Sequence, residues 1–155
     1  MAQNKIISNK IITGDLKEVY NAIDWEFARD KVFFITGATG VIGSFLVRCL
    51  NYANKQSGLG IKIVLPVRDL QKVRLLYNVK ETTDANMEVI QNDITNKIIY
   101  KENVDYIIHC ASNTASMSFV NTPEETFNIS AKGTENILNF AKEKKIKSMI
   151  YLSSM

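Results

Sequence analysis

Short apolar runs alternate with helical patterns along most of this chain. Runs rich in aliphatic and aromatic residues predict strands that are buried on both faces of a sheet. They lie at residues 32–35, 61–67, 87–91, 104–110 and 149–152. Apolar residues at helical spacing predict helices at about 42–54 and 70–77, a weak one at 95–101 and a long one beginning near Thr122, with a polar loop at 80–86. Strands that alternate with helices indicate an α/β fold with a parallel sheet and helices on both faces.

The order of these elements predicts a Rossmann-like, doubly wound sheet with strand order 3-2-1-4-5 that stops after the fifth strand. A ligand crevice is then expected where the order reverses, at the carboxyl ends of strands one and four. Residues 1–30 precede the first strand and form a helical extension with one apolar stripe. Trp25 is expected to pack this extension onto the domain at 31–155, and stacking on a ligand is the alternative.

Both prolines of the chain lie at informative positions. Pro66 indicates that the second strand has an edge position or an irregular end, because proline has no N–H for the ladder. Pro123 suits the first turn of the long helix, where Thr122 is expected to cap and Glu125 to complete a capping box. The expected buried stripe of that helix consists of Phe127, Ala131, Thr134, Leu138 and Ala141.

Three equally spaced glycines lie between the first strand and the following helix, in KVFFITGATGVIG (31–43). A strand, a tight turn and a helix N-terminus leave backbone N–H groups pointing outward and favour an anion. Gly37, Gly40 and Gly43 would let the backbone approach a pyrophosphate and let the helix lie close to the strand. The pattern predicts dinucleotide binding, and the alternative is a tight turn that binds nothing.

Composition excludes several other classes of protein. A length of 155 residues suffices for one domain with a substantial core, and 46% hydrophobic and 23% charged residues are ordinary values. A formal charge of +3 is too small to indicate nucleic-acid binding, and no apolar run approaches membrane-spanning length. Cys49 and Cys110 lack metal-type spacing, and one histidine with scattered acids builds no metal site. Two such thiols and no recognisable secretion signal indicate the cytoplasm.

Five landmarks, taken in order, resemble one family. They are TGATGVIG (36–43), Asp93, HCAS (109–112), AKGT (131–134) and LSS (152–154). Together they resemble the extended short-chain dehydrogenase/reductases, the NAD-dependent epimerase/dehydratase proteins whose usual substrates are nucleotide sugars. The resemblance runs from Lys31 to Met155 and covers the N-terminal part of that family's NAD(P)-binding domain. It implies that NAD(P) contacts Thr36, Gly37, Thr39, Gly40, Val41, Ile42, Gly43, Arg68, Asp93, Ile94, Ala111 and Ser112.

The end of the second strand bears on which dinucleotide binds. In this fold an acid there binds the ribose diol of NAD, whereas an arginine accommodates the 2′-phosphate of NADP. The family's usual aspartate position falls on Val67, and Arg68 follows it, which favours NADP. Asp69 weakens this argument, and an exposed arginine paired with an acid is the alternative.

The resemblance assigns roles to other strand ends. It implies that Asp93 contacts the adenine, although an aspartate that caps a loop is the alternative. Ala111 and Ser112 have small side chains that leave room for the ribose and nicotinamide side of the cofactor. His109, two residues earlier, is interpreted as a packed strand residue rather than an acid or base.

The catalytic residue that the resemblance implies is Ser154, which would hydrogen-bond the reacting sugar oxygen, with Ser153 as the neighbouring candidate. The family's base is a tyrosine with a lysine four residues later, and none of the six tyrosines has one. Ser130 replaces the family's helix asparagine.

These features predict the NAD(P)-binding part of a longer nucleotide-sugar epimerase, dehydratase or reductase, inactive by itself. The alternative is a non-catalytic dinucleotide-binding module. The uncovered fifth strand is expected to permit self-association.

Overall fold

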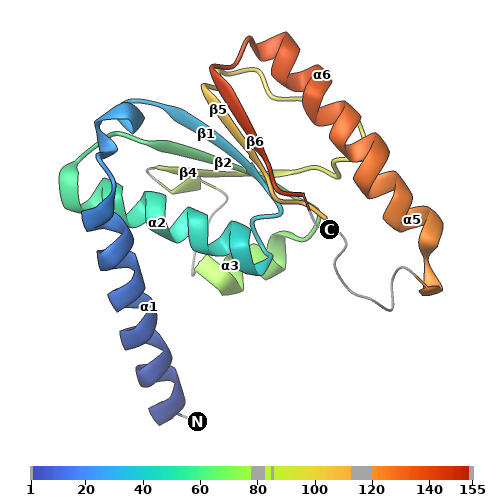
Figure 1. Cartoon of the computed structure of the whole chain (residues 1–155). Helices are drawn as coiled ribbons and strands as arrows, with labels where there is room; N and C mark the ends of the chain where they lie inside the picture. Colours follow the sequence, from blue (N-terminus) through green and yellow to red (C-terminus); the bar gives the residue numbers. More distant parts are fainter. Residues whose placement is uncertain (1, 78–82, 85, 113–119, 154–155) are drawn as a thin grey trace.

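Within residues 2–77, 83–84, 86–112 and 120–153, which the computed structural model describes, six strands form one central sheet (Figure 1). They are β1 (Val32–Thr36), β2 (Lys62–Val67), β3 (Thr83–Asp84), β4 (Met87–Gln91), β5 (Tyr106–His109) and β6 (Ser148–Tyr151). Their spatial order is β3-β4-β2-β1-β5-β6, and neighbouring strands run parallel except β3 with β4. The expected order 3-2-1-4-5 is confirmed for the five longer strands.

The antiparallel strand β3 lies in a segment where the sequence predicts only a polar loop. Thr83 pairs with Glu88, and Asp84 pairs with Met87, at the outer edge of the sheet. A strand of two residues is too short to show an alternating pattern, so the sequence gives no signal for it.

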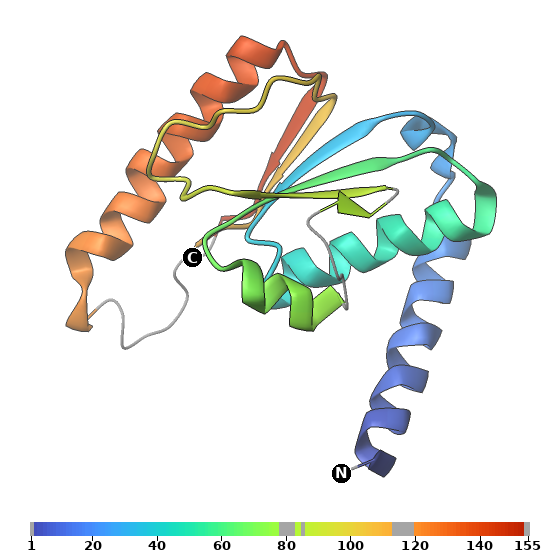
Figure 2. The ribbon, with the colours of Figure 1, turned by 180° about the vertical axis from the view of Figure 1, so that it is seen from behind.

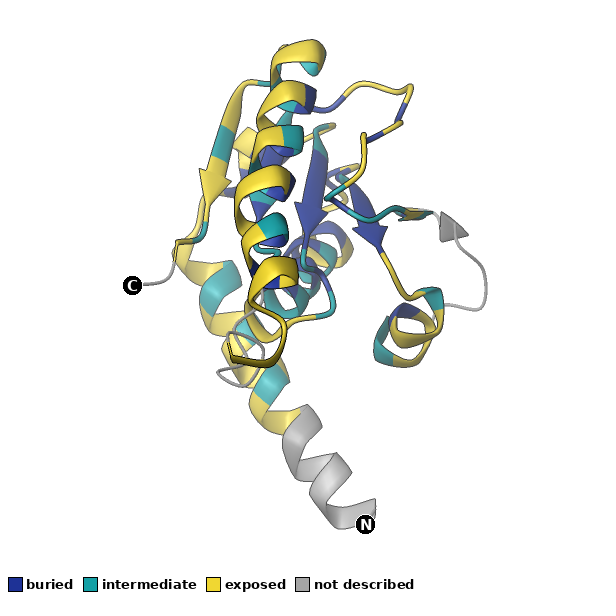
Figure 3. Ribbon diagram, turned by 90° about the vertical axis from the view of Figure 1, so that its right-hand side faces the viewer, coloured by how far each residue is buried: buried dark blue, intermediate teal, exposed yellow. Residues whose placement is uncertain are grey.

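Helices cover both faces of the sheet, because neighbouring residues of a strand point to opposite sides. Phe33 and Ile35 of β1 pack on one face, against α2 (Val41–Ser57) and α3 (Leu70–Tyr77). Phe34 lies on the other face, where its ring centroid is 4.8 Å from that of Phe140 in α6 (Thr134–Lys144). Figure 2 shows these layers from behind, and β1 and β2 between them are buried along almost their whole length (Figure 3).

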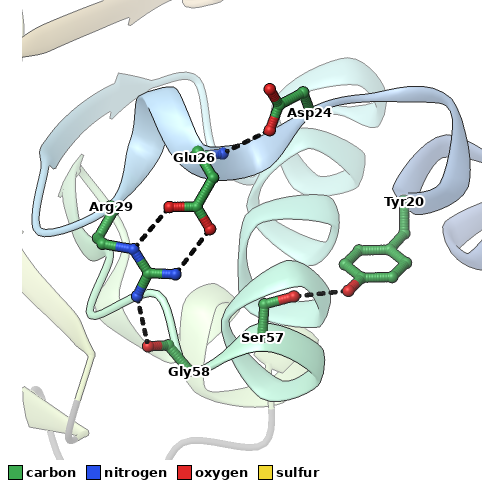
Figure 4. A network of polar contacts seen from close by, with 6 residues as sticks. All are labelled: Tyr20, Asp24, Glu26, Arg29, Ser57 and Gly58. Atoms are coloured by element: carbon green, nitrogen blue, oxygen red, sulfur yellow. Dashed lines mark hydrogen bonds and ion pairs between the residues drawn. The ribbon is translucent and has the colours of Figure 1, made fainter.

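The residues before β1 form a helix that packs on α2. This helix is α1 (Ala2–Ala22), and the 3₁₀-helix η1 (Trp25–Ala28) follows it. Trp25 is buried, and its Nε1–H donates to the Tyr20 carbonyl oxygen at 3.0 Å. The Tyr20 hydroxyl lies 2.5 Å from Ser57 Oγ, and Arg29 donates two hydrogen bonds to the Glu26 carboxylate (Figure 4). The packing role expected of Trp25 is confirmed.

The long helix is confirmed, but the expected buried stripe is wrong. The helix consists of α5 (Pro123–Asn128), a π-helical turn η2 (Ile129–Gly133) and α6. Its buried residues are Thr126, Ile129, Gly133, Ile137 and Phe140. Of the expected stripe, Ala131 is exposed, Thr134 and Ala141 are half-buried, and Phe127 and Leu138 are 70% and 54% exposed. A Cβ at Gly133 would lie 2.8 Å from Ile94 Cδ1, so the buried face of the long helix includes a glycine. A pattern of apolar side chains does not reveal a glycine on a buried face.

The capping box expected at the start of α5 is also wrong. Thr122 makes no side-chain capping hydrogen bond. Its carbonyl oxygen instead accepts hydrogen bonds from the backbone N–H and the hydroxyl of Thr126. Pro123 occupies the first turn as expected, and the Glu125 carboxylate pairs with Arg68.

Two further predictions about strands and helices need correction. Of the two alternatives for Pro66, the edge position is wrong, because its strand is interior, between β1 and β4, and Pro66 is buried opposite Ile90. Its ladder with β1 ends at Val64, so the missing N–H of Pro66 lies beyond that ladder. Residues 95–101 form a turn, a bend and irregular chain instead of a weak helix, and Ile98 and Tyr100 are buried there.

Candidate functional site

The glycine turn joins the carboxyl end of β1 to the first turn of α2. Gly37 has a φ of +67°, a left-handed conformation that favours glycine. A Cβ on it would lie 2.6 Å from the Cys110 carbonyl carbon and oxygen and 2.7 Å from the Ala111 nitrogen. Gly37 therefore lets the turn lie directly against the end of β5. The Gly40 N–H donates to the Gly37 carbonyl oxygen at 2.9 Å and closes the turn.

The third glycine brings α2 against the turn. A Cβ on Gly43 would lie 2.3 Å from the Gly37 carbonyl oxygen, closer than any side chain permits. Gly40 is different: among the described residues, its Cβ would meet only Gly37 O within 4 Å, at 3.3 Å. Gly40 is also exposed, so its outer side is open.

A cavity of about 570 Å³ lies where the strand order reverses, between the ends of β1, β2, β4 and β5. The lining brings together eight of the residues expected to contact NAD(P): Gly37, Thr39, Gly40, Arg68, Asp93, Ile94, Ala111 and Ser112. It also includes residues that the sequence did not single out as contacts, namely Lys72, Asn92, Thr122, Glu125 and Ile129.

The other predicted residues are placed differently. Val41 and Ile42 are exposed on the first turn of α2, and Gly43 is buried beneath it. Thr36 is fully buried behind the cavity. Ser154, the predicted catalytic residue, lies outside the residues that the structure describes.

A buried hydrogen-bond network supports the cavity from behind. The Ala111 N–H donates to Thr36 Oγ1 at 3.2 Å, and Thr36 Oγ1 lies 2.6 Å from His109 Nδ1. His109 Nε2 lies 3.4 Å from the Thr134 hydroxyl at the start of α6. We assign the Thr36 hydroxyl as donor to Nδ1, which places the ring proton on Nε2, facing Thr134.

Burial keeps this histidine neutral. His109 is 1% exposed, and burial lowers its pKa from 6.5 to about 4. The interpretation of His109 as a packed strand residue is confirmed. Its two ring nitrogens link β1, β5 and α6, a role that the sequence analysis did not foresee.

Arg68 and Asp69, both at the end of β2, have different partners. Asp69 Oδ1 accepts the N–H groups of Gln71 and Lys72, at 2.9 and 3.1 Å, and so caps α3. The Arg68 guanidinium is exposed and lies 3.4 Å from Glu125 Oε1. The alternative of an exposed arginine paired with an acid therefore describes Arg68 in this structure.

Asp93 also forms a local contact. Its Oδ1 accepts hydrogen bonds from the N–H of Thr95 at 2.9 Å and from the Thr95 hydroxyl at 2.8 Å. This is the loop-capping geometry that was the alternative for Asp93. Asp93 and Ile94 nevertheless line the cavity, so contact with an adenine stays a prediction.

One support of the glycine turn was missed by the sequence analysis. The Tyr77 hydroxyl, at the end of α3, donates to the Ala38 carbonyl oxygen at 2.5 Å. Arg48 of α2 lies over the Tyr77 ring, 5.8 Å from its centroid, and donates to the Leu76 carbonyl oxygen. Burial raises the pKa of Tyr77, so the phenol remains a donor. Nothing in the local pattern points to this contact, because it joins residues 39 positions apart.

Two general properties of the described part of the chain concern metals and membranes. Its His, Cys, Asp and Glu side chains form no group of three that could hold a metal ion. None of its helices combines the length and the apolar character needed to cross a bilayer.

Comparison with known proteins gives one family. A model of the NAD dependent epimerase/dehydratase family matches residues 33–155. An uncharacterized membrane protein of Methanocaldococcus jannaschii is 24% identical over 131 residues, which are 83% of this chain and 37% of that protein. The solved epimerase Mth375 of Methanothermobacter thermautotrophicus is 25% identical with a TM-score of 0.63, over 84% of this chain and 37% of that one.

A third comparison supports the fold alone. The structure of WbmF from Bordetella bronchiseptica in complex with NADH is 19% identical with a TM-score of 0.65, over 83% of this chain and 37% of that one. In each of these comparisons, the chain spans a little over a third of the relative's length.

Proposed function

Because this chain belongs to the NAD dependent epimerase/dehydratase family, we propose that it is the NAD(P)-binding part of an enzyme that epimerises, dehydrates or reduces a nucleotide sugar. The observation that carries the proposal is the glycine turn at the switch point of the sheet, open on its Gly40 side to a cavity of about 570 Å³. Bound there, the nicotinamide would supply hydride transfer.

Three groups of residues would hold the dinucleotide. The turn from Gly37 to Gly40 offers backbone N–H groups and the N-terminus of α2 to the pyrophosphate. Asp93 and Ile94 would lie beside the adenine, and Ala111 and Ser112 beside the nicotinamide half, as the family resemblance implies. WbmF, solved with NADH and also with NAD+ and UDP, has the same fold.

We favour NADP over NAD because of the end of β2. No carboxylate stands at the family's usual aspartate position, which is Val67, and Asp69 is used as the cap of α3. Arg68 and Lys72 both line the cavity, and two cations there would favour a 2′-phosphate.

The chemistry on the sugar needs groups beyond those described. We propose that Ser154 hydrogen-bonds the reacting sugar oxygen and that the base is not among the six tyrosines, since none has a lysine four residues later. We expect the chain to bind cofactor in the cytoplasm without turning over a nucleotide sugar. A second candidate is a non-catalytic dinucleotide-binding module, and turnover of a nucleotide sugar by the protein would exclude it.

Titration of the folded chain with NADP+ and NAD+ by calorimetry tests the proposed function. Gly40→Val should fold, since its Cβ meets only one close atom, but should weaken binding by about tenfold or more, 1.4 kcal/mol. Gly14→Val is the matched control, because a Cβ at Gly14 in α1 has nothing within 4 Å among the described residues. Unchanged affinity in a folded Gly40→Val variant would show that the turn is not the phosphate site.

A further inference from the structure

An ion pair joins two residues that line the candidate cofactor site. Arg68 comes from the end of β2 and Glu125 from α5, 57 residues later, and Arg68 Nη1 lies 3.4 Å from Glu125 Oε1. Both residues line the 570 Å³ cavity, and both also line an adjoining cavity of about 550 Å³. We propose that Glu125 determines how strongly this site discriminates between NADP and NAD, by holding Arg68 and by repelling a 2′-phosphate. This inference rests on the proposed dinucleotide function.

The sequence places Glu125 there through the packing of α5. Thr126 and Ile129 are buried on the side that faces the sheet, and the Thr126 hydroxyl bonds to the Thr122 carbonyl oxygen. Glu125 is exposed and comes directly before buried Thr126 in the chain. Its carboxylate pairs with Arg68, and both residues line the cavity.

The other carboxylates of the lining are engaged in local contacts. Asp69 Oδ1 caps α3, and Asp93 Oδ1 holds the Thr95 turn. Glu125 is the lining carboxylate that pairs with Arg68 in the described part of the chain. A phosphate that binds Arg68 must replace this carboxylate or lie beside it.

The consequence for affinity follows from charge. A 2′-phosphate carries up to two negative charges, whereas the ribose 2′-hydroxyl of NAD carries none. A carboxylate beside Arg68 disfavours binding of the phosphate in two ways. It competes with the phosphate for the guanidinium, and it repels the phosphate because both are negatively charged. Removal of the charge should raise the affinity for NADP+ about fivefold and that for NAD+ less than about twofold, since exposed ion pairs have modest energies.

Glu125→Gln tests this with nearly the same side-chain shape. Glu124→Gln is the matched control, because Glu124 is the adjacent exposed acid and lines only the adjoining cavity. The probes are NADP+ and NAD+, together with adenosine 2′,5′-bisphosphate and 5′-AMP, which differ only in the 2′-phosphate. We expect Glu125→Gln to raise the ratio of NADP+ to NAD+ affinity and Glu124→Gln to leave it unchanged. In an Arg68→Gln background, the gain should be smaller.

Each other result overturns the inference. If the wild type binds both dinucleotides and Glu125→Gln does not change their ratio, Glu125 has no such role and the proposed function stands. An equal gain in Glu124→Gln would assign the effect to net charge rather than to the ion pair. If the wild type binds neither dinucleotide nor the adenosine phosphates, the proposed function itself fails, and this inference fails with it.

Discussion

Thr36 Oγ1 lies 2.6 Å from His109 Nδ1, and this contact joins the carboxyl ends of β1 and β5. The two residues are paired in register, so both side chains point to the same face of the sheet. Thr36 also accepts the Ala111 N–H, and Ala111 lines the cavity. The hydrogen bond therefore fixes the backbone on which the candidate site is built.

The burial of His109 predicts an acid-sensitive fold. The folded-state pKa of His109 is about 4, and its ordinary value is 6.5, so between these pH values the unfolded chain binds more protons than the folded one. Stability from the neutral ring is complete above pH 6.5 and is lost as the pH falls toward 4. The loss is on the order of 3 kcal/mol, at 1.36 kcal/mol for each pKa unit. Urea unfolding from pH 4 to 7.5 measures it.

His109→Asn separates this effect from the titration of the acids. His109 is the single histidine of the chain, so the variant keeps every other titrating group. We expect the variant to be less stable at pH 7.5 and to lose less stability than the wild type between pH 6.5 and 4. Parallel pH profiles for the two proteins would contradict the assignment.

Gly43→Ala should disturb the glycine turn without reaching the cavity. The added Cβ would lie 2.3 Å from the Gly37 carbonyl oxygen, so α2 must move away from the turn. We expect a loss of about 1–3 kcal/mol in the free energy of unfolding, typical of overpacking. Gly14→Ala, in open space on α1, should not be destabilised. Thermal unfolding of both variants checks this, and wild-type stability for Gly43→Ala would disprove the close approach.

The sequence predicted the sheet well because local patterns determine it. The run Val32–Thr36 is apolar and ends at glycine, so both the strand and the turn could be recognised. The cavity lining followed from topology, since parallel strand ends meet at one edge. The position of Arg68, directly after the second strand, was enough to place it at this edge of the sheet.

The parts that escaped prediction depend on contacts between distant residues. Glu125 has suitable spacing for a capping box, but its partner in space is 57 residues away. The buried face of the long helix passes through Gly133, whose contact with Ile94 has no hydrophobic signal. His109 could be recognised as buried, but not as a link between Thr36 and Thr134, because that requires the register of β1 with β5.

Tyr77→Phe should weaken the turn by removing one hydrogen bond. The variant keeps the ring beneath Arg48 but leaves the Ala38 carbonyl oxygen, in a buried residue, without the phenol donor. Loss of such a partner costs about 1–3 kcal/mol, and we expect dinucleotide affinity to fall as well. Tyr52→Phe is the control, because it removes the hydroxyl of a tyrosine on a different helix, α2. Calorimetric titration and urea unfolding measure both effects, and equal behaviour of the two variants would contradict a role in the turn.

The exposed face of β6 leads to the last prediction, which concerns self-association. In the part of the chain that the structure describes, β6 is the outermost strand beside β5. Ile150 and Tyr151 are 59% and 49% exposed, and an exposed apolar edge strand offers unpaired backbone groups to a second copy (Figure 3). We expect sedimentation velocity to show concentration-dependent association of the chain. A charge introduced on β6 should therefore weaken the self-association.

Ile150→Lys should weaken this association by about tenfold or more, because a lysine on an edge strand opposes pairing with a second strand. A tenfold change in affinity corresponds to about 1.4 kcal/mol. Leu75→Lys is the matched control, since Leu75 is 87% exposed on α3, away from β6. A monomer at high concentration would remove the premise, and equal weakening by both lysines would assign the association to general surface hydrophobicity. A selective effect of Ile150→Lys would locate the contact at β6, because the two substitutions add the same charge and remove similar apolar side chains.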